Sequence, residues 1–137
     1  MTAPIEITDG LAQRLDDELV VWLTTVRSDA TPQVSLVWFL WDGGEFLIYS
    51  EPGKAKLRNM SNNPVVSLNL NSIGDGGVAV FTGEARLSPE DGDMSTNPRY
   101  VDKYRSLIEG ELATSVEAIG TAYRVAVRVK PNSLRSW

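Results

Sequence analysis

The sequence predicts a mainly β protein of the α+β class, an antiparallel barrel of about six strands with a few peripheral helices. Short stretches rich in β-branched and aromatic residues follow one another along the chain. Glycine, proline and aspartate separate these stretches at turns, and helical patterns are confined to the flanks. Closing such a sheet protects its edge strands. The length of 137 residues suits a single domain, residues 1–137.

The first element is an amphipathic helix. Leu11, Leu15 and Leu19 recur at helical spacing after a Thr-Asp-Gly sequence, so Thr8 or Asp9 is expected to cap it. An Asp-Gly-Gly sequence at 42–44 predicts a hairpin between the second and third strands. A polar helical excursion is expected over about 89–117. The six expected strands cover residues 20–26, 33–41, 45–50, 65–70, 78–87 and 121–130.

The composition excludes several kinds of chemistry. Zero cysteines and zero histidines remove disulfides, thiolate nucleophiles, the commonest general base and the commonest transition-metal ligands. We therefore expect no metal site, and any redox chemistry falls to an organic cofactor. A formal net charge of −5 disfavours nucleic-acid binding. The chain has no signal-peptide pattern and no apolar run of about 20 residues, so a cytoplasmic protein without a membrane segment is expected.

Charge reverses locally in the segment that follows the third strand. Lys54, Lys56 and Arg58 fall within five residues, and no aspartate or glutamate occurs from Pro52 to Gly74. The free amides and dipole of a helix start favour an anion. A phosphate-bearing ligand is the simplest reason for this cluster, although three such cations also occur on solvated helix faces. The acidic pairs at 16–17 and 90–91 lie in polar stretches, and solvation explains them.

The segment PQVSLVWFLWDGGEFLIYSEPGKAKLRNMSNNPVVSLNL, residues 32–70, resembles the core of pyridoxamine 5'-phosphate oxidase-like split β-barrel proteins, which bind flavin or deazaflavin cofactors. The WFLW strand, the tyrosine-serine strand end and the KxKxRN helix start resemble most the actinobacterial branch. Many members of that branch use the deazaflavin coenzyme F420 instead of FMN. The resemblance therefore implies a split barrel and a flavin-type cofactor.

The resemblance also implies roles for individual residues. Ser50, Lys54 and Lys56 match positions that hold the cofactor phosphate, and Arg58 lies close enough to add charge. The strand along which the tricyclic ring lies is matched by Gln33, Val34, Ser35 and Val37. Relatives often have proline where this chain has Leu36. The C-terminal Arg135 and Trp137 match a tail that approaches the ring or closes the pocket.

The expected function is an F420-dependent reductase that transfers a hydride from the reduced deazaflavin to a small electron-poor substrate. The alternatives are an FMN-dependent oxidoreductase and a non-catalytic binder of a flavin, a deazaflavin or a tetrapyrrole. The resemblance implies a homodimer with cofactor sites at the interface. Vitamin B6 oxidation is disfavoured because the chain ends in SLRSW and lacks that enzyme's histidine-containing motif. No catalytic residue can be named. Trp38 and Trp41 should face opposite sides of their strand.

Overall fold

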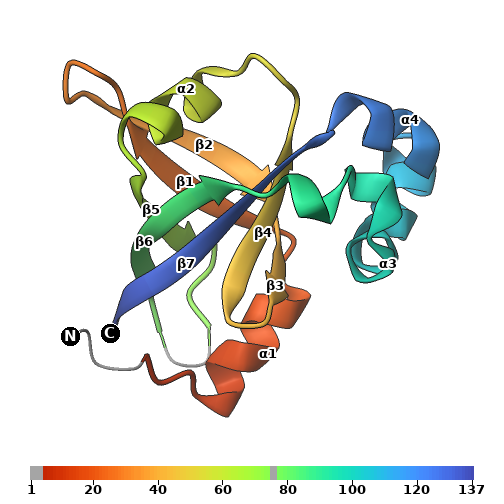
Figure 1. Ribbon diagram of the computed structural model, residues 1–137. Helices are drawn as coiled ribbons and strands as arrows, with labels where there is room; N and C mark the ends of the chain where they lie inside the picture. Colours follow the sequence, from red (N-terminus) through yellow and green to blue (C-terminus); the bar gives the residue numbers. More distant parts are fainter. Residues whose placement is uncertain (1–4, 75–76) are drawn as a thin grey trace.

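The fold is an antiparallel sheet curled into a half-barrel, with helices at its two ends and along one side (Figure 1). The computed structural model describes residues 5–74 and 77–137. The sheet has seven strands in the order β2-β1-β5-β6-β7-β4-β3. Their bounds are β1 Val20–Val26, β2 Pro32–Trp38, β3 Leu40–Asp42, β4 Glu45–Ser50, β5 Val65–Leu70, β6 Ala79–Leu87 and β7 Val125–Ser136. The α+β split barrel expected from the sequence is confirmed.

The helices divide into three groups. α1 lies at one end of the barrel and α2 at the other, while α3 and α4 lie together beside the β3–β4 hairpin (Figure 1). We call the helical insertion between β6 and β7, residues 88–124, the cap. The helical bounds are α1 Asp9–Asp17, α2 Ala55–Asn62, α3 Pro98–Ser106 and α4 Val116–Ala122, with shorter turns η1 Pro89–Asp91, η2 Met94–Thr96 and η3 Leu107–Glu111. None of the described helices combines the length and the apolar character needed to cross a bilayer.

The strands differ from the sequence prediction chiefly at three points. The expected strand 33–41 is interrupted at Phe39, which gives seven strands instead of six. The expected last strand began at Thr121, but Thr121 and Ala122 close α4, which the Ser115 side chain caps at its start and which ends before its C-cap residue Tyr123, whose amide donates to the Ile119 carbonyl. β7 then continues beyond the expected end, to Ser136.

Local signals explain the elements that were predicted well. The Thr8 side chain accepts a hydrogen bond from the Leu11 amide and so caps α1. Gly43 and Gly44 adopt φ values of +59° and +80°, which a two-residue hairpin turn requires and which glycine adopts without strain. Sequence chemistry alone therefore fixes the start of α1 and the β3–β4 turn.

The break at Phe39 is stabilised by the cap. The Phe39 amide donates a 2.8 Å hydrogen bond to the Tyr104 hydroxyl, which lies 2.6 Å from the Leu19 carbonyl oxygen. Lys103 Nζ donates to the Phe39 carbonyl at 2.9 Å and lies 3.8 Å from the centre of its ring. The backbone groups exposed by the break are thus satisfied by α3. The corner where the barrel splits is consequently tied to the cap.

The sheet separates two apolar cores. The first fills the barrel, where Trp41 packs edge-on against Phe46 with ring centres 4.9 Å apart. The second lies between the sheet and the cap, where Trp38 stacks on Tyr104 at 4.3 Å and 1°. The two tryptophans therefore lie on opposite sides of the sheet, as expected from their spacing. The seam between the sheet and the cap is where the candidate site opens.

Candidate functional site

The start of α2 has the features of an anion site. β4 ends at the buried Ser50, and a turn through Gly53 at φ +76° leads into the helix. Lys54 occupies the N-cap position, but its side chain does not cap the helix, and the first turn contains no acidic residue. The amides of this turn therefore lack a side-chain acceptor, as an anion-binding helix start requires. We call residues 50–58 the cradle.

The cations of the cradle are only weakly neutralised by the protein. Lys54 Nζ lies 3.5 Å from a Glu51 carboxylate oxygen, and both side chains are open to solvent, with exposed fractions of 52% and 40%. Such a pair contributes little to stability. Arg58 donates a hydrogen bond to the Gly53 carbonyl at 2.9 Å. Burial, followed by repulsion from Lys54, lowers the pKa of Lys56. An arriving anion would relieve this crowding of positive charge.

A buried amide attaches the cradle to the barrel. Asn59 Nδ2 donates to the Gln33 side-chain oxygen at 2.7 Å and lies 3.0 Å from Thr25 Oγ1. These contacts hold α2 against β1 and the start of β2. Gln33, which the resemblance assigned to the strand along the ring, thus lies next to the cradle, and its side-chain oxygen accepts a hydrogen bond from Asn59.

β2 offers an open backbone edge beside the cradle. It pairs with β1 on one side and is an outermost strand of the sheet. Val34 and Leu36 project on the outer face with exposed fractions of 57% and 48%, whereas Val37 is buried. Ser35 is half-buried on the same face as Val37. The unpaired backbone edge of β2 can form hydrogen bonds with the polar rim of a flat ring. The exposed apolar face of β2, which carries Val34 and Leu36, is a second and distinct feature.

A pocket of about 190 Å³ lies at the seam between the sheet, α2 and the cap. Lys56 contributes its side chain to the wall, so it lies at the boundary between cradle and pocket. The other lining residues are mostly apolar or aromatic: Leu36, Val37, Trp38, Tyr49, Met94, Tyr100 and Tyr123. We call this space the cap-side pocket. Mostly apolar walls with a few polar groups are typical of small-molecule sites.

The two C-terminal residues predicted for the site, Arg135 and Trp137, lie far from the cradle in space. Arg135 pairs with Val80 near the far end of β7, and its guanidinium lies 5.2 Å from the ring centre of Trp137. Val125, at the opposite end of the same strand, pairs with Ser50. Ten residues of strand span about 33 Å. A single chain thus assembles the cradle and the β2 edge but leaves Arg135 and Trp137 apart from them.

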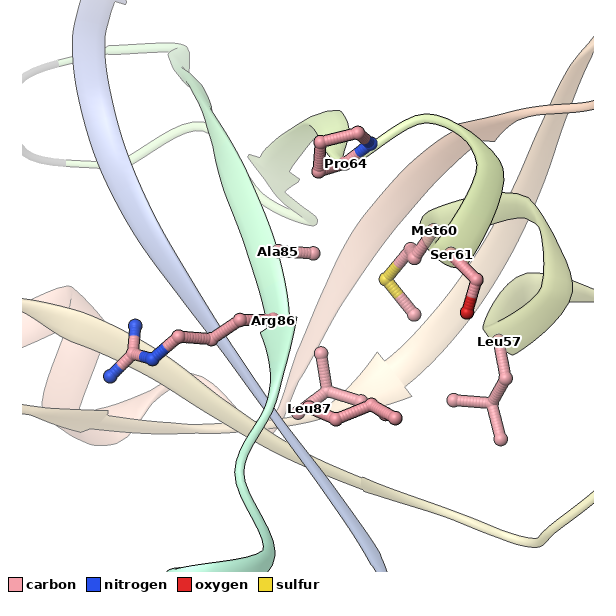
Figure 2. A pocket seen from close by; sticks show the side chains of 8 residues that line it. Leu57, Met60, Ser61, Pro64, Ala85, Arg86 and Leu87 are labelled. Atoms are coloured by element: carbon pink, nitrogen blue, oxygen red, sulfur yellow. The ribbon is translucent and has the colours of Figure 1, made fainter.

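A second pocket of about 270 Å³ lies on another face of α2 (Figure 2). Leu57, Met60 and Leu87 contribute apolar side chains to it. Arg86 is part of its wall, but its guanidinium points away and forms a two-fold hydrogen bond with Glu45, at 2.7 and 3.1 Å. This pocket therefore offers no free charge to an anionic ligand.

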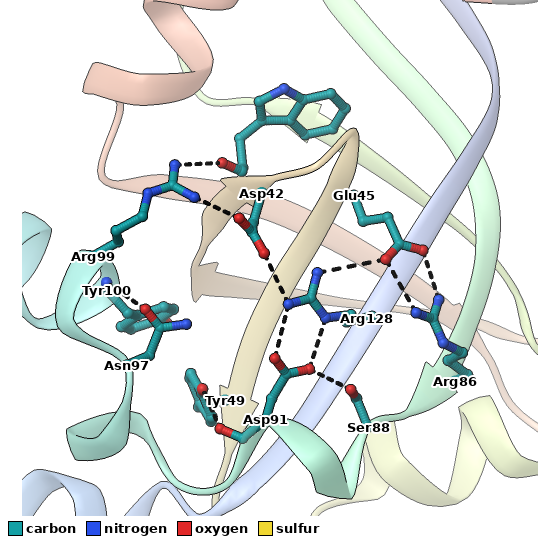
Figure 3. A network of polar contacts seen from close by, with 11 residues as sticks. Asp42, Glu45, Tyr49, Arg86, Ser88, Asp91, Asn97, Arg99, Tyr100 and Arg128 are labelled. Atoms are coloured by element: carbon teal, nitrogen blue, oxygen red, sulfur yellow. Dashed lines mark hydrogen bonds and ion pairs between the residues drawn. The ribbon is translucent and has the colours of Figure 1, made fainter.

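Arg86 belongs to a network of ion pairs centred on Arg128 (Figure 3). Arg128 contacts both Asp91 oxygens, at 2.7 and 2.8 Å, and reaches Asp42 at 2.9 Å. Hydrogen bonding to Arg128 lowers the pKa of Asp91. We call the set Asp42, Glu45, Arg86, Asp91, Arg99 and Arg128 the Arg128 network. It joins the cap to the β3–β4 hairpin and to β6 and β7, so solvation does not explain Asp91, contrary to our expectation from the sequence.

Sequence reasoning missed the part of the site that the cap contributes. Met94 and Tyr100 lie in the expected helical excursion and Tyr123 in the expected last strand, and nothing local in the sequence indicated that they share a pocket with Lys56. The pairing of Ser50 with Val125 brings Tyr123 close to the cradle. Long-range strand pairing of this kind is absent from local sequence patterns. Asn59 was visible only as the last letter of the KxKxRN helix start.

Comparison with solved structures shows the same fold over nearly the whole chain. An F420 reductase matches with a TM-score of 0.66 and 23% identity, covering 97% of this chain and 98% of that one. A conserved hypothetical protein from Mycobacterium tuberculosis matches with a TM-score of 0.71 and 20% identity over 100% and 89%. The heme storage protein of Vibrio cholerae matches with a TM-score of 0.65 and 15% identity over 96% and 95%. These identities establish similarity of fold only.

At the level of sequence, no curated protein matches this chain. The family model described as pyridoxamine 5'-phosphate oxidase matches residues 7–137, which include the cradle, β2 and the cap. The chain therefore belongs to the pyridoxamine 5'-phosphate oxidase family.

Proposed function

We propose that the protein is an F420-dependent reductase that acts on a small electron-poor substrate. The observation that supports this most directly is the start of α2, an uncapped, acid-free helix terminus with Lys54 at its N-cap and the open edge of β2 beside it. A flavin-type cofactor with a phosphate tail and a flat ring fits both features. The fold similarity to an F420 reductase supports the choice of cofactor.

The residues of the cradle would hold the phosphate. The first-turn amides of α2 and the Lys54 ammonium would bind its oxygens, and Arg58 would add positive charge from the same helix. Ser50 now donates its hydroxyl hydrogen to the Glu51 carbonyl at 2.8 Å and would have to turn to reach a phosphate. Binding energy at the tail would fix the position of the ring.

The β2 edge would orient the ring. Backbone groups between Gln33 and Val37 would hydrogen-bond its polar rim, and the cap-side pocket would exclude water from its reacting face. When bound, the deazaflavin supplies a hydride, which suits reduction better than oxygen chemistry. The chain contains no histidine or cysteine, so the contribution of the protein is binding and orientation.

A second copy of the chain would complete the site. The outer face of the sheet presents three exposed aliphatic side chains on two strands, Val34 and Leu36 on β2 and Val65 on β5. We propose that a homodimer buries this face, and that Arg135 and Trp137 approach the cradle of the opposite copy. Analytical ultracentrifugation checks this proposal: we expect a dimer in the wild type and a shift toward monomer in Leu36→Asp.

Two other functions have specific support. FMN shares the phosphate and the tricyclic shape and would use the same cradle, so an FMN-dependent oxidoreductase is the first alternative. The fold similarity to a heme storage protein favours a non-catalytic binder as the second. The absence of histidine in the chain argues against ordinary haem ligation. Vitamin B6 oxidation is the least supported, because the 137 residues contain no histidine to match that enzyme's motif.

Parallel titrations test the proposal. Purified protein is titrated with F420 and, separately, with FMN at the same salt concentration, and tryptophan and cofactor fluorescence are followed. We expect tight binding of F420 and weaker binding of FMN. Preference for FMN would replace the reductase proposal with the first alternative. Turnover of an artificial acceptor by reduced F420 then distinguishes an enzyme from a carrier.

A further inference from the structure

In the described part of the chain, Asn59 is the residue whose side chain links α2 to the sheet by hydrogen bonds. The side-chain hydrogen bond of Arg58, on the same helix, goes instead to Gly53 in the preceding turn. Met60 and Leu57 also hold α2 against the barrel, but through apolar packing, which is not directional. Hydrogen bonds depend strongly on angle and distance. Asn59 is therefore the contact that can fix the exact position of α2 on the barrel.

Asn59 contacts two residues that face each other on neighbouring strands. Its Nδ2 atom donates to the Gln33 side-chain oxygen on β2 at 2.7 Å and to Thr25 Oγ1 on β1 at 3.0 Å. Thr25 and Gln33 are partners in the ladder between these strands, and the Thr25 hydroxyl donates to the Gln33 carbonyl at 3.5 Å. One amide group thus ties the helix to both strands at the start of β2.

Water is largely excluded from these contacts. Asn59 and Thr25 are buried, with exposed fractions of 7% and 1%. A buried polar group that loses its partner costs the free energy of its desolvation. Any movement of α2 away from β2 would separate the Asn59 amide from its two acceptors. One position of the helix relative to the strand is therefore strongly preferred.

Asn59 lies between the two parts of the candidate site. Ala55 and Lys56 precede it by one helical turn, so its side chain lies on the same face of α2 as the part of the cradle that opens the helix. On the sheet it contacts Gln33, from which the open edge of β2 continues to Val37. The cradle presents amides and cations for an anion, whereas the β2 edge presents backbone groups for a flat ring. The contact made by Asn59 consequently sets the spacing between the cradle and the β2 edge.

We propose that Asn59 is a positioning residue, which fixes the distance between the cradle and the β2 edge so that one ligand binds both, with its anionic tail and its flat ring. Two linked contacts can raise affinity by roughly 10²- to 10⁴-fold, provided that the geometry allows both at once. Asn59 itself does not touch the ligand in this role. The inference rests on the proposed function in that both contacts belong to one cofactor.

The test compares F420 with the deazaflavin that carries the same ring and ribityl chain but no phosphate, the ring probe. Fluorescence titration gives both dissociation constants, and their ratio measures the gain from binding the tail as well as the ring. We expect Asn59→Leu to lower this ratio about tenfold, because tail and ring no longer fit at once. Its affinity for the ring probe should change by less than about twofold. A purely structural role would weaken both ligands alike and leave the ratio unchanged.

Two further variants serve as control and as confirmation. Asn62→Leu makes the same substitution at an exposed position of α2 and should leave the ratio unchanged. Thr25→Val removes one of the two acceptors and should lower the ratio by a smaller factor, which keeps the test decisive if Asn59→Leu does not fold. Thermal melts verify that each variant folds. A wild-type ratio in every folded variant of Asn59 and Thr25 overturns the inference.

Failure of the proposed function has a different signature, because it appears in the wild type. If the wild type prefers FMN, the F420 proposal is wrong, and the ratio between FMN and riboflavin, which differ by the phosphate alone, tests Asn59 in the same way. If neither cofactor binds more tightly than its phosphate-free form, the inference is overturned together with the cradle. Tight binding of F420 with a ratio that Asn59→Leu does not change overturns the inference alone.

Discussion

The cradle and the Arg128 network are both clusters of positive side chains, but they differ in how far the protein itself neutralises them. Arg128 and Asp91 are partly buried, with side-chain exposed fractions of 14% and 13%, and are bonded to each other twice. Among the described residues, the one carboxylate paired with Lys54 is that of Glu51, at 3.5 Å and exposed to solvent. A saturated cluster stabilises the fold, whereas an unsaturated cluster beside an uncapped helix is available to a ligand. The hydrogen-bonding partners of the positive side chains therefore distinguish a structural role from a ligand-binding role better than the number of charges does.

The largest effect is expected from breaking the Arg128 network. Arg128→Met removes both hydrogen bonds to Asp91 and one of the ion pairs of Asp42, and each hydrogen bond to a charged group contributes about 1.5 to 3 kcal/mol. The free energy of unfolding, from denaturant titration, measures the loss. Affinity for F420, measured where the variant is folded, should stay within about twofold. A variant as stable as the wild type would show that the network is not structural.

The converse effect is expected in the cradle. Lys54→Ala should weaken F420 binding by about 1 to 3 kcal/mol, because a charge-assisted contact with the phosphate is lost. The free energy of unfolding should hardly change, since the pair with Glu51 is exposed. Fluorescence titration at two salt concentrations measures the affinity, with Lys130→Ala as the charge control. Unchanged affinity would remove Lys54 from the site.

A smaller effect is expected at the edge of the Arg128 network. Arg86 is half-exposed, and Arg128 still contacts Glu45 when Arg86 is replaced. Arg86→Gln should therefore cost only about 0 to 1 kcal/mol of stability. Denaturant melts of this variant beside Arg128→Met compare the rim of the network with its centre. Equal losses of stability in the two variants would mean that Arg128 contributes no more to the network than Arg86 does.

The pH dependence of stability sharpens the same comparison. The pKa values of Asp91 and Glu45 are lowered mainly by hydrogen bonds from Arg128 and Arg86, respectively. Because these carboxyls release their protons more easily in the folded state, their contribution is present above about pH 4 and is lost as the pH falls through the lowered pKa values. Arg128→Met should flatten this acid limb in unfolding measurements, whereas Lys54→Ala should leave it as in the wild type.

Local chemistry made much of this molecule predictable. The glycine turn at 43–44, the cap of α1, the cationic helix start and the opposite faces of Trp38 and Trp41 all follow from residues close in sequence. The break at Phe39 does not, because the groups that satisfy its backbone come from α3, 65 residues away. Asp91 gave no local sign of its partner Arg128, which lies 37 residues further on.

The candidate site divides in the same way. Lys54, Lys56 and Arg58 were visible as a run of cations, and the open edge of β2 followed from the resemblance. Tyr123 was not visible, because its closeness to the cradle depends on the pairing of Ser50 with Val125. Arg135 and Trp137 were placed at the site by resemblance, and a single chain leaves them at the far end of β7. Local sequence patterns thus reveal the residues that α2 contributes to the site, whereas those from the cap become apparent only in the tertiary structure.

The most direct test of the central claim is residue-level mapping of the F420 contact by NMR titration of backbone amides. We expect the largest shifts at residues 54–56 at the start of α2 and along the β2 edge from 33 to 37, with no comparable shifts at Met60 and Leu87 in the apolar pocket of Figure 2 or in the Arg128 network of Figure 3. Shifts centred on Met60 and Leu87, or no shifts in α2 at saturating F420, would contradict the assignment of the cradle as the cofactor site.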